Sequence, residues 1–172
     1  MNCGVWKRVI IWMAAGVSIL WAGGYESSYT SIKADRCRTI STDEIGSRQE
    51  CRSFADIRVE VIDNDLRQDI TLYRGRDRYP LNFFGKISSQ WSMLGEKIEW
   101  RYRKNDRAHP FAMIVRFKVS EDLNRPEKMT SYLLVSKITP DTICVVGKIP
   151  PQAGQNQRAR EMARRARHMK CL

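Results

Sequence analysis

The sequence predicts a small α+β domain, in which an antiparallel sheet of five to seven strands carries a carboxyl-terminal helix on one face. Apolar residues alternate with polar residues over several short stretches, which is the period of a strand with one buried face. Short polar segments separate these stretches, as in antiparallel hairpins. The clearest helical spacing of apolar residues comes near the carboxyl terminus. At 172 residues the chain fits one such domain and an export segment.

The first 22 residues have the order of a secretory signal peptide. Lys7 and Arg8 precede a 14-residue apolar run, Val9–Ala22, and small residues follow it. A membrane-spanning helix needs about 20 apolar residues, so this run favours a leader over a span. Cleavage after Ala22 would place Leu20 where a small residue is preferred, which leaves the cut site, and an uncleaved membrane tether, open.

Residues 23–34 are small and polar, so we expect a flexible lead-in there, followed by a single disulfide-bonded domain over residues 35–172. The net charge of the chain is +11, and loss of the two leader cations reduces it to +9. A charge of this size attracts anionic partners such as lipid headgroups, cell-wall polymers or nucleic acid. Many exported proteins are basic without such a partner, so the net charge is weak evidence of function.

Four cysteines follow the leader: Cys37, Cys51, Cys144 and Cys171. An even number of cysteines in an exported chain predicts two disulfides. Three pairings are possible, and we favour Cys37 with Cys51 and Cys144 with Cys171, because each closes a short loop at one end of the chain. The alternative use is a zinc site, but the sequence lacks the closely spaced cysteine and histidine pairs of such sites. We expect neither a metal nor a cofactor.

The amino-terminal part of the domain predicts short strands joined by polar turns. Cys37–Ile40 is expected to form a strand, followed by a turn over residues 41–49. Ile57–Ile62 and Leu66–Leu72 alternate in polarity and predict a hairpin. The acidic triplet Asp63–Asp65 between them could suggest calcium, but it lacks the glycine and distal glutamate of a calcium loop. We therefore interpret the triplet as a turn.

Residues 74–95 show no clear period, and we expect a long connection with a short helix around Ser88–Met93. Arginines followed by aromatic residues can bind single-stranded nucleic acid through phosphate contacts and base stacking. We favour the simpler interpretation, in which the aromatic residues close one end of the core, and we do not expect nucleic acid as a partner. The residues that could make this segment a binding loop are Arg74, Arg76, Arg78 and Trp91.

A hairpin at Ile98–Arg103 and Phe111–Lys118, joined by the polar segment Lys104–Pro110, is expected to form the centre of the sheet. Each arm alternates apolar and polar side chains, so one face of the hairpin is buried. An acid and two arginines on the other face resemble an active-site group, but opposite charges on neighbouring strands are ordinary stabilisers of a sheet. These residues are Glu99, Arg101 and Arg116.

The segment after this hairpin predicts two more strands. A charged turn at Glu121–Lys128 leads to a strand at Tyr132–Ile138, a tight turn at Thr139–Thr142 and a strand at Ile143–Ile149. Residues 97–149 thus predict a four-stranded meander. The last strand is apolar on both sides, so both of its faces must be covered.

The predicted cover is an amphipathic helix at Gln157–Met169, which follows two strand-ending prolines. Its narrow apolar stripe contains small side chains, which let a helix lie close to a sheet. A disulfide from Cys171 to Cys144 would place the helix over the face to which Cys144 and Val146 point. The stripe consists of Ala159, Met162, Ala163, Ala166 and Met169.

The rest of the helix surface is strongly basic. Arginine side chains grip phosphates through two nitrogens, so this surface could dock on anions. Taken alone, the charge pattern favours an ordinary solvated surface, in which Glu161 pairs with Arg165 four residues on. A role at a membrane interface is less favoured, because the apolar stripe lacks large residues. The basic residues are Arg158, Arg160, Arg164, Arg165, Arg167 and Lys170.

Few residues suggest catalysis. The two histidines, His109 and His168, lie in a predicted turn and on the basic helix, and no recognised nucleophile, phosphate-loop or metalloprotease motif occurs. We do not expect an enzyme. A hydrolase built on two carboxylates would leave no local signature, and it would require a pocket holding two acids with perturbed pKa values.

Several short motifs together resemble a group of uncharacterised secreted proteins of Gram-negative bacteria. The resemblance covers residues 35–172 and implies export and a single domain. The group has no assigned activity, so the resemblance supplies no catalytic or binding residue. The motifs are DLR at Asp65–Arg67, GEKIEWR at Gly95–Arg101, AMIVR at Ala112–Arg116, LLVSKI ending at Ile138, CVV at Cys144–Val146 and QNQRAREMA before the terminal Cys171.

The sequence therefore favours an exported, periplasmic binding or accessory protein. Its basic carboxyl-terminal helix would meet an anionic envelope polymer, a lipid surface or an acidic protein. The alternative is an inhibitor of another secreted protein that acts through the loop at Arg74–Leu94.

Overall fold

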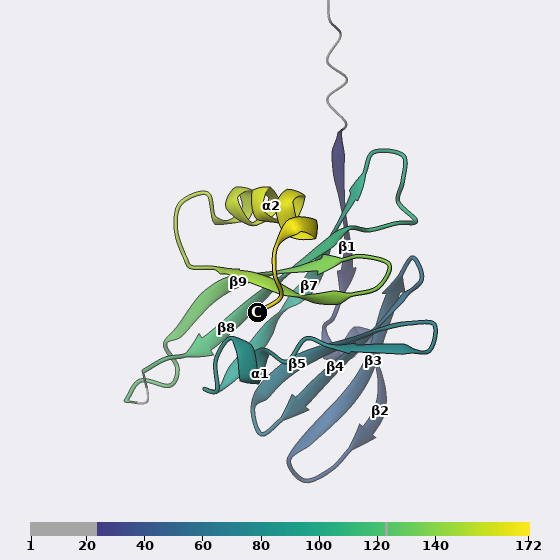
Figure 1. Cartoon of the computed structure of the whole chain (residues 1–172). Coiled ribbons are helices and arrows are strands. Elements are labelled where there is room, and N and C mark those ends of the chain that lie inside the picture. The colour runs from purple at the N-terminus through teal and green to yellow at the C-terminus, as the bar shows by residue number, and fades with distance from the viewer. Residues whose placement is uncertain (1–23, 123) are drawn as a thin grey trace, which may run out of the picture.

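The computed structural model describes residues 24–122 and 124–172. These residues form a mostly-β structure, in which a 10-stranded, mostly antiparallel sheet carries a helix at the carboxyl terminus (Figure 1). The sheet has more strands than the five to seven that the sequence predicts. The α+β expectation is therefore correct only in its coarse form, a sheet that is covered by a helix. The predicted signal peptide, residues 1–22, lies outside the described residues.

The elements follow one another along the chain as short strands with few helical turns. The strands are β1 (Tyr25–Ser31), β2 (Arg38–Thr42), β3 (Gly46–Phe54), β4 (Ile57–Asn64), β5 (Arg67–Arg74), β6 (Asp77–Pro80), β7 (Ser92–Arg103), β8 (Ala112–Ser120), β9 (Met129–Ile138) and β10 (Ile143–Ile149). The helical segments are η1 (Ala34–Arg36), α1 (Phe83–Lys86), α2 (Gln155–Arg165) and its continuation η2 (Ala166–His168).

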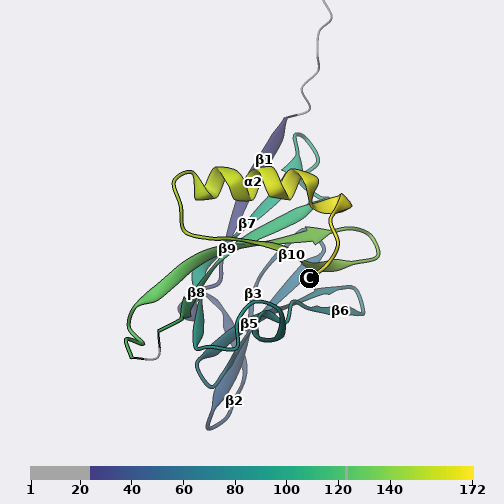
Figure 2. The same ribbon diagram turned by 60° about the vertical axis from the view of Figure 1, so that its left-hand side comes forward.

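The strand order is β10-β9-β8-β7-β5-β4-β3-β2, with β1 paired to β7 and β6 paired to β5. The meander predicted over residues 97–149 is present as β7 to β10. β5 and β7 run parallel and pair only at Arg67 and Ser92. The sheet bends at this joint, so Figures 1 and 2 show two halves, one formed by β1 and β7 to β10 and the other by β2 to β6.

The main core lies between the two halves. Trp100 of β7 is fully buried, and its ring is stacked on Phe54 of β3 with the ring centroids 5.2 Å apart. Phe83 of α1 packs on Phe117 of β8 at the same centroid distance. The indole nitrogen of Trp100 donates a 2.8 Å hydrogen bond to Thr30 Oγ1, so its polar atom is satisfied inside the core. Side chains from both halves thus fill one apolar interior.

A second apolar layer lies between α2 and the outer face of β8, β9 and β10 (Figure 2). Ala159, Ala163 and Ala166 are fully buried there, so the helix lies close to the sheet. Cys144 and Val146 point to the helix, whereas Ile143 and Val145, which alternate with them, belong to the main core. The expectation that the last strand is covered on both faces is confirmed.

Two disulfides join Cys37 to Cys51 and Cys144 to Cys171 in the described part of the chain. This is the pairing that the sequence favours. The second disulfide ties the segment after η2 to β10, where Leu172 N also donates to Val145 O at 2.9 Å. Disulfides form and persist in oxidising compartments, so they indicate a location outside the cytoplasm. Within residues 24–122 and 124–172, no helix has the length and apolar character required to cross a membrane.

The flexible lead-in expected over residues 23–34 is wrong for most of its length. Tyr25–Ser31 form β1, and all seven residues pair with β7. The prediction failed because these residues are mostly polar and show no apolar alternation. Their serines instead bond to the sheet: Ser27 Oγ donates to Glu99 at 2.6 Å, and Ser28 Oγ lies 3.0 Å from the hydroxyl of Tyr102.

Two other local predictions also need correction. The turn expected over residues 41–49 is shorter, because β3 already begins at Gly46. The helix expected at 88–93 forms instead at Phe83–Lys86, and residues 88–91 precede β7. Asn82 caps this helix by accepting a hydrogen bond from Gly85 N at 3.1 Å, a local signal that the periodicity analysis does not detect.

Loss of the Cys144–Cys171 disulfide should destabilise the fold slightly more than loss of Cys37–Cys51. The two bonds close loops with sequence separations of 27 and 14 residues, and loop-closure entropy gives about 3.6 and about 3.0 kcal/mol, respectively. Urea unfolding of the two double alanine variants, Cys144→Ala/Cys171→Ala and Cys37→Ala/Cys51→Ala, measures both values. An unchanged midpoint in the first variant would show that packing alone holds α2 on the sheet.

Candidate functional site

The six basic residues of the carboxyl-terminal helix region do not form one free surface. Arg160 turns toward the sheet, where its Nε lies 2.7 Å from Glu99 Oε1 and one terminal nitrogen lies 3.2 Å from Glu99 Oε2. The same terminal nitrogen donates to the hydroxyl of Tyr29 at 3.0 Å. Arg160 is therefore engaged in joining α2 to β7 and β1. The other five side chains, Arg158, Arg164, Arg165, Arg167 and Lys170, are exposed.

Glu99 receives this arginine in a largely covered position, with 12% of its side chain exposed. Burial favours the neutral acid. The hydrogen bonds from Arg160 and Ser27, and the charges of Arg160 and Arg101, outweigh burial, so the pKa of Glu99 lies below its ordinary value. Arg101 is buried beside it, 3.7 Å from Glu99 Oε1, and donates to Ser27 Oγ. This cluster stabilises the contact between helix and sheet.

The sequence predicts that one face of the central hairpin carries Glu99, Arg101 and Arg116. The strand register agrees with this prediction. Glu99 lies opposite Ile114, and Arg101 opposite Ala112, on the side of the sheet that α2 covers. Arg116 donates to Ser131 Oγ at 2.7 Å and to Gln155 Oε1 at 3.2 Å, at the start of α2. These charged residues therefore position the helix rather than face open solvent.

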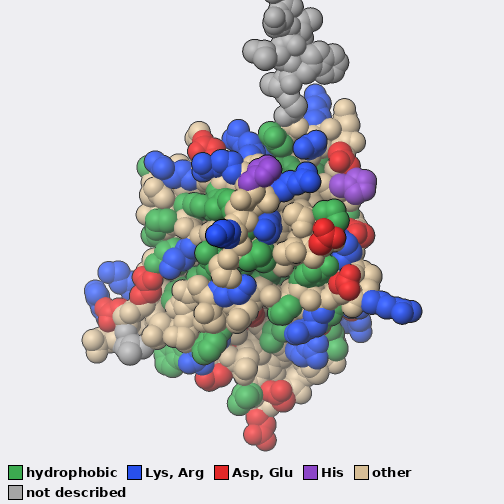
Figure 3. All heavy atoms as spheres, in the orientation of Figure 1, with side chains coloured by type: hydrophobic (Ala, Val, Ile, Leu, Met, Phe, Trp, Pro, Cys, Tyr) green, Lys and Arg blue, Asp and Glu red, His purple; other side chains and the backbone are tan. Residues whose placement is uncertain are grey.

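Two arginines at the other end of α2 help to line a depression of about 380 Å³, which we call the basic pocket. It lies between η2, the β7–β8 loop, the first residue of β1 and the β9–β10 turn. Figure 3 shows Lys, Arg and His side chains gathered at the end of the molecule that carries α2. Its basic lining residues are Arg103, His109, Arg164, Arg167 and His168, with the carboxylate of Asp106 beside them.

These residues come from three segments that are distant in the sequence, and hydrogen bonds hold each segment in place. Arg103 is the last residue of β7 and pairs with Tyr25 of β1. Within the β7–β8 loop, Asp106 N donates to Arg103 O at 2.9 Å, and His109 N donates to Asp106 O at 3.2 Å. At the end of the helix, Lys137 Nζ donates to Met169 O at 2.9 Å, which holds η2 against β9. The pocket is therefore supported by the sheet.

The charges in the basic pocket are unbalanced. The carboxylate of Asp106 lies beside His109, with Oδ1 2.6 Å from Nδ1, and makes no ion pair with an arginine of the pocket. Within the part of the chain that the structure describes, Arg103, Arg164 and Arg167 make no ion pair. Cations are favoured at the carboxyl end of a helix, which explains why two arginines are tolerated there. Their side chains remain free to bind an anion.

The four residues of the predicted binding loop are not brought together. Arg74 Nε lies 2.9 Å from Asp56 Oδ2, and its Nη1 donates to Thr139 O at 2.8 Å, so it ties β5 to the β9–β10 turn. Arg76 lies in the exposed β5–β6 turn, and Trp91 is 44% exposed just before β7. Arg78 lies on β6, where it lines a separate groove. No single loop surface supports the inhibitor alternative.

That groove contains two carboxylates, as the hydrolase alternative requires, but both make structural contacts. Burial raises the pKa of Asp69, although hydrogen bonds from backbone nitrogens oppose the rise. Its two oxygens accept from Ile70 N at 2.7 Å and from Phe83 N at 2.9 Å, which fixes the start of α1. Asp65 forms an ion pair with Arg67. This arrangement does not favour an acid–base pair.

The turn predicted at the Asp63–Asp65 triplet lies further along the chain, because Asp63 and Asn64 belong to β4 and the turn consists of Asp65 and Leu66. Asp65 and Leu66 have φ angles of 52° and 58°, the left-handed values of a two-residue turn that suits the twist of a hairpin. Asp63 Oδ2 accepts from Gln68 Nε2 at 3.0 Å. Across residues 24–122 and 124–172, no three His, Cys, Asp or Glu residues are grouped so that they could hold a metal ion.

Sequence reasoning identified Arg164 and Arg167 but missed Arg103 and the role of His109. The histidine was visible as a turn residue, but no local pattern links the β7–β8 loop to the end of α2. In comparisons with known proteins, no family model matches the chain, and no curated protein or solved structure is significantly similar to it. The site is therefore interpreted from its own geometry.

Glu99→Gln should lower stability at neutral pH by about 1 to 2 kcal/mol, because it removes the charge that Arg160 binds. The pKa of Glu99 in the folded state lies below its ordinary value of 4.5, so its contribution is complete above that value and is lost as the pH falls through the folded-state pKa. The variant should therefore lose less stability than the wild type on acidification below the ordinary value. Urea unfolding across this pH range measures the difference.

Glu96→Gln is the matched control on the same strand. The side chain of Glu96 is 73% exposed and pairs with Lys33 at 3.1 Å, so its removal should change stability by less than about 0.5 kcal/mol. Equal pH profiles for Glu99→Gln and the wild type would show that the Glu99–Arg160 contact does not stabilise the docked helix.

Proposed function

We propose that this protein is an exported binding protein that holds an anionic group of an envelope component in the basic pocket. The observation that carries the proposal is the convergence of Arg103, Arg164 and Arg167 on one depression without carboxylate partners among the described residues. Cations held near one another repel, and a bound anion removes this cost. Arginine also presents paired donors that match phosphate and carboxylate oxygens.

The shape of the basic pocket favours a compact anion carried on an apolar framework. Phe111 and Tyr25 form part of its wall, with ring centroids 5.5 Å apart in an edge-to-face arrangement. The Arg164 guanidinium lies 6.0 Å from the Tyr25 ring centroid. A phosphate substituent on a polymer fits such a site better than an extended acidic polypeptide, which would need a longer basic surface. We therefore take a phosphate-bearing envelope polymer as the partner class.

The signs of export support a partner that belongs to the cell envelope. The leader-like order of residues 1–22 and the resemblance to secreted proteins of Gram-negative bacteria both favour the periplasm. The two disulfides agree with an oxidising compartment. In that compartment, a basic protein meets the anionic polymers and headgroups of the envelope.

Arg164→Glu/Arg167→Glu should weaken binding of inorganic polyphosphate, used as a defined phosphate polymer, at least about tenfold and should flatten its salt dependence. Isothermal titration of the full, oxidised chain at two salt concentrations measures both effects. The matched control, Arg158→Glu/Arg165→Glu, makes the same change in net charge on the same helix outside the basic pocket.

The comparison of the two variants decides whether the pocket matters. The control should lose no more than about twofold in affinity, because its residues contribute only to the long-range field. Equal losses in both variants would show that binding depends on total charge, and would refute a defined site in the basic pocket.

A further inference from the structure

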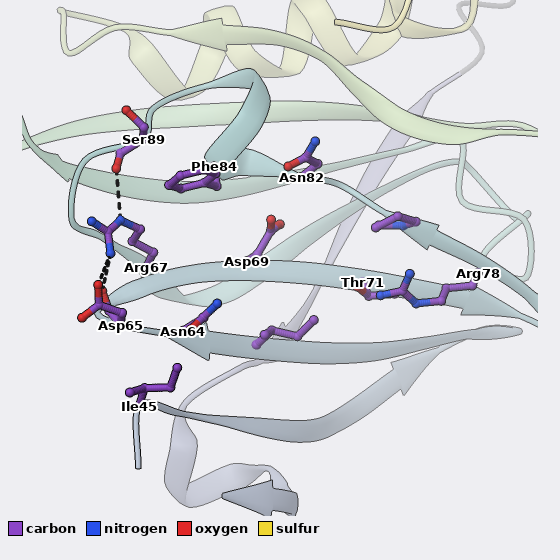
Figure 4. Close-up of a pocket in the computed structure, with 12 residues that line it drawn as sticks. Ile45, Asn64, Asp65, Arg67, Asp69, Thr71, Arg78, Asn82, Phe84 and Ser89 are labelled. Carbon is purple, nitrogen blue, oxygen red and sulfur yellow. Dashed lines mark hydrogen bonds and ion pairs between the residues drawn. The ribbon is translucent and has the colours of Figure 1, made fainter. Parts of the chain in front are cut away.

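A hollow on the other half of the sheet is separate from the basic pocket, and we call it the outer groove. It has a volume of about 890 Å³ and lies on the outer face of β4, β5 and β6, between the β2–β3 turn and α1 (Figure 4). This volume is within the usual range of small-molecule sites, about 300 to 1,000 Å³. Its apolar lining residues are Ile45, Ile62, Pro80 and Phe84, and the rest of the lining is polar or charged, including Arg78 and the buried Thr71.

The strand register explains how the groove arises. Ile62 lies opposite Asp69, and Thr71 opposite Pro80, so these side chains share the face that points away from the main core. The neighbours that alternate with them, such as Ile70, are fully buried between the two halves. The outer groove is therefore separate from the core, and changes in its lining need not disturb core packing.

Large apolar side chains form the walls of the groove and remain exposed. Ile45 is 65% exposed at the tip of the β2–β3 turn, and Phe84 is 52% exposed on α1. Phe84 is held in place by Arg67, whose guanidinium lies 5.8 Å from the ring centroid and whose Nε donates to Ser89 O at 3.1 Å. Exposed apolar area costs about 25 cal/mol per Å², so a ligand that covers these walls gains binding energy.

The charges around the groove are balanced at one end and unbalanced at the other. Arg67 pairs with Asp65, and the carboxylate of Asp69 accepts backbone hydrogen bonds at the start of α1. The buried Glu60 beside the groove accepts from Arg48 Nε at 3.0 Å and from Nη2 at 2.8 Å. In contrast, Arg78 makes no ion pair with any residue that the structure describes.

Figure 4 shows the Arg78 side chain extending along the strands toward Thr71, at the end of the groove away from Asp65 and Arg67. The distance along β5 from Arg67 to Thr71 is roughly 13 Å, at about 3.3 Å per residue. A ligand that uses the whole groove thus needs an extended apolar body and one anionic end.

We propose that the outer groove binds an amphiphile of the long-chain fatty-acid class, with its carboxylate on Arg78 and its alkyl chain between Ile62, Pro80 and Phe84. The guanidinium matches the two carboxylate oxygens, and the apolar walls cover the chain. This binding site is on a different half of the sheet from the basic pocket. It therefore does not depend on the function proposed above.

A fluorescent fatty acid, dansyl undecanoic acid, tests the proposal on the full, oxidised chain. Its fluorescence should rise and shift to the blue on binding, and hexadecanoate should displace it. Hexadecanol has the same chain without the charge, and acetate has the charge without the chain. Both should compete at least about tenfold less well than hexadecanoate, because each lacks one half of the recognised chemistry.

Arg78→Glu should weaken hexadecanoate binding at least about tenfold while leaving that of hexadecanol nearly unchanged. The matched control is Arg76→Glu, which makes the same charge change two residues away in the exposed turn and should have no more than about a twofold effect. Phe84→Ser should weaken both ligands, whereas Ile40→Ser, at an exposed isoleucine outside the groove, should weaken neither.

Several results would overturn the assignment. They are the absence of saturable probe binding, equal losses in the Arg78 and Arg76 variants, or equal competition by hexadecanol and hexadecanoate. Displacement of the probe by an acidic peptide as effectively as by hexadecanoate would point to a peptide groove and also refute the proposal. Thermal unfolding of each variant checks that it is folded, and Arg164→Glu/Arg167→Glu should retain full probe binding.

Discussion

The stacking of Trp100 on Phe54 is the contact on which the two-part sheet depends. The halves share backbone hydrogen bonding only at the short parallel joint between Arg67 and Ser92, so side-chain packing must hold their inner faces together. Truncation of a buried aromatic residue of this kind costs about 3 to 5 kcal/mol in typical cores. The indole also needs Thr30 as its hydrogen-bond acceptor. Packing of the core is therefore linked to the presence of β1, and β1 forms one wall of the basic pocket.

The position of α2 follows from contacts along its whole length. Gln155 donates to Ser131 O at 2.9 Å at the start of the helix, Arg160 binds Glu99 near its middle, and Lys137 holds the carbonyl of Met169 after its end. The buried alanines add close packing, and the terminal disulfide limits separation of the helix from β10. A helix fixed in this way presents its last arginines in one place, which is the condition for a site that selects a compact anion.

Local periodicity predicted the strands and the helix whose two sides differ in polarity. It failed for elements that lack this difference and are held in the fold by tertiary contacts. The β4–β5 hairpin, the β7–β10 meander and α2 all carry clear apolar patterns, and they form as expected. β1 has no such pattern. It joins the sheet because Ser27 and Ser28 form hydrogen bonds with side chains of β7. The pairing of cysteines could be favoured from loop lengths alone. The basic pocket could not be predicted, because Arg103 and the end of α2 come together only through the fold of the sheet.

Side chains along each strand point alternately to the two faces of the sheet. The residues that stabilise the core therefore differ from the residues that are available for binding. Inward residues of both halves fill the main core, while outward residues carry different chemistry on each half. On the half formed by β1 and β7 to β10, the outward face is used to bind α2, which leaves charged residues at the edge of the helix. On the half formed by β2 to β6, no long helix covers the outward face in the described residues, so Ile62 is partly exposed there and Phe84 of α1 is 52% exposed beside it. The same fold can therefore expose a cationic site and an apolar groove, because the three arginines of the first and the exposed Ile45 and Phe84 of the second lie outside the core.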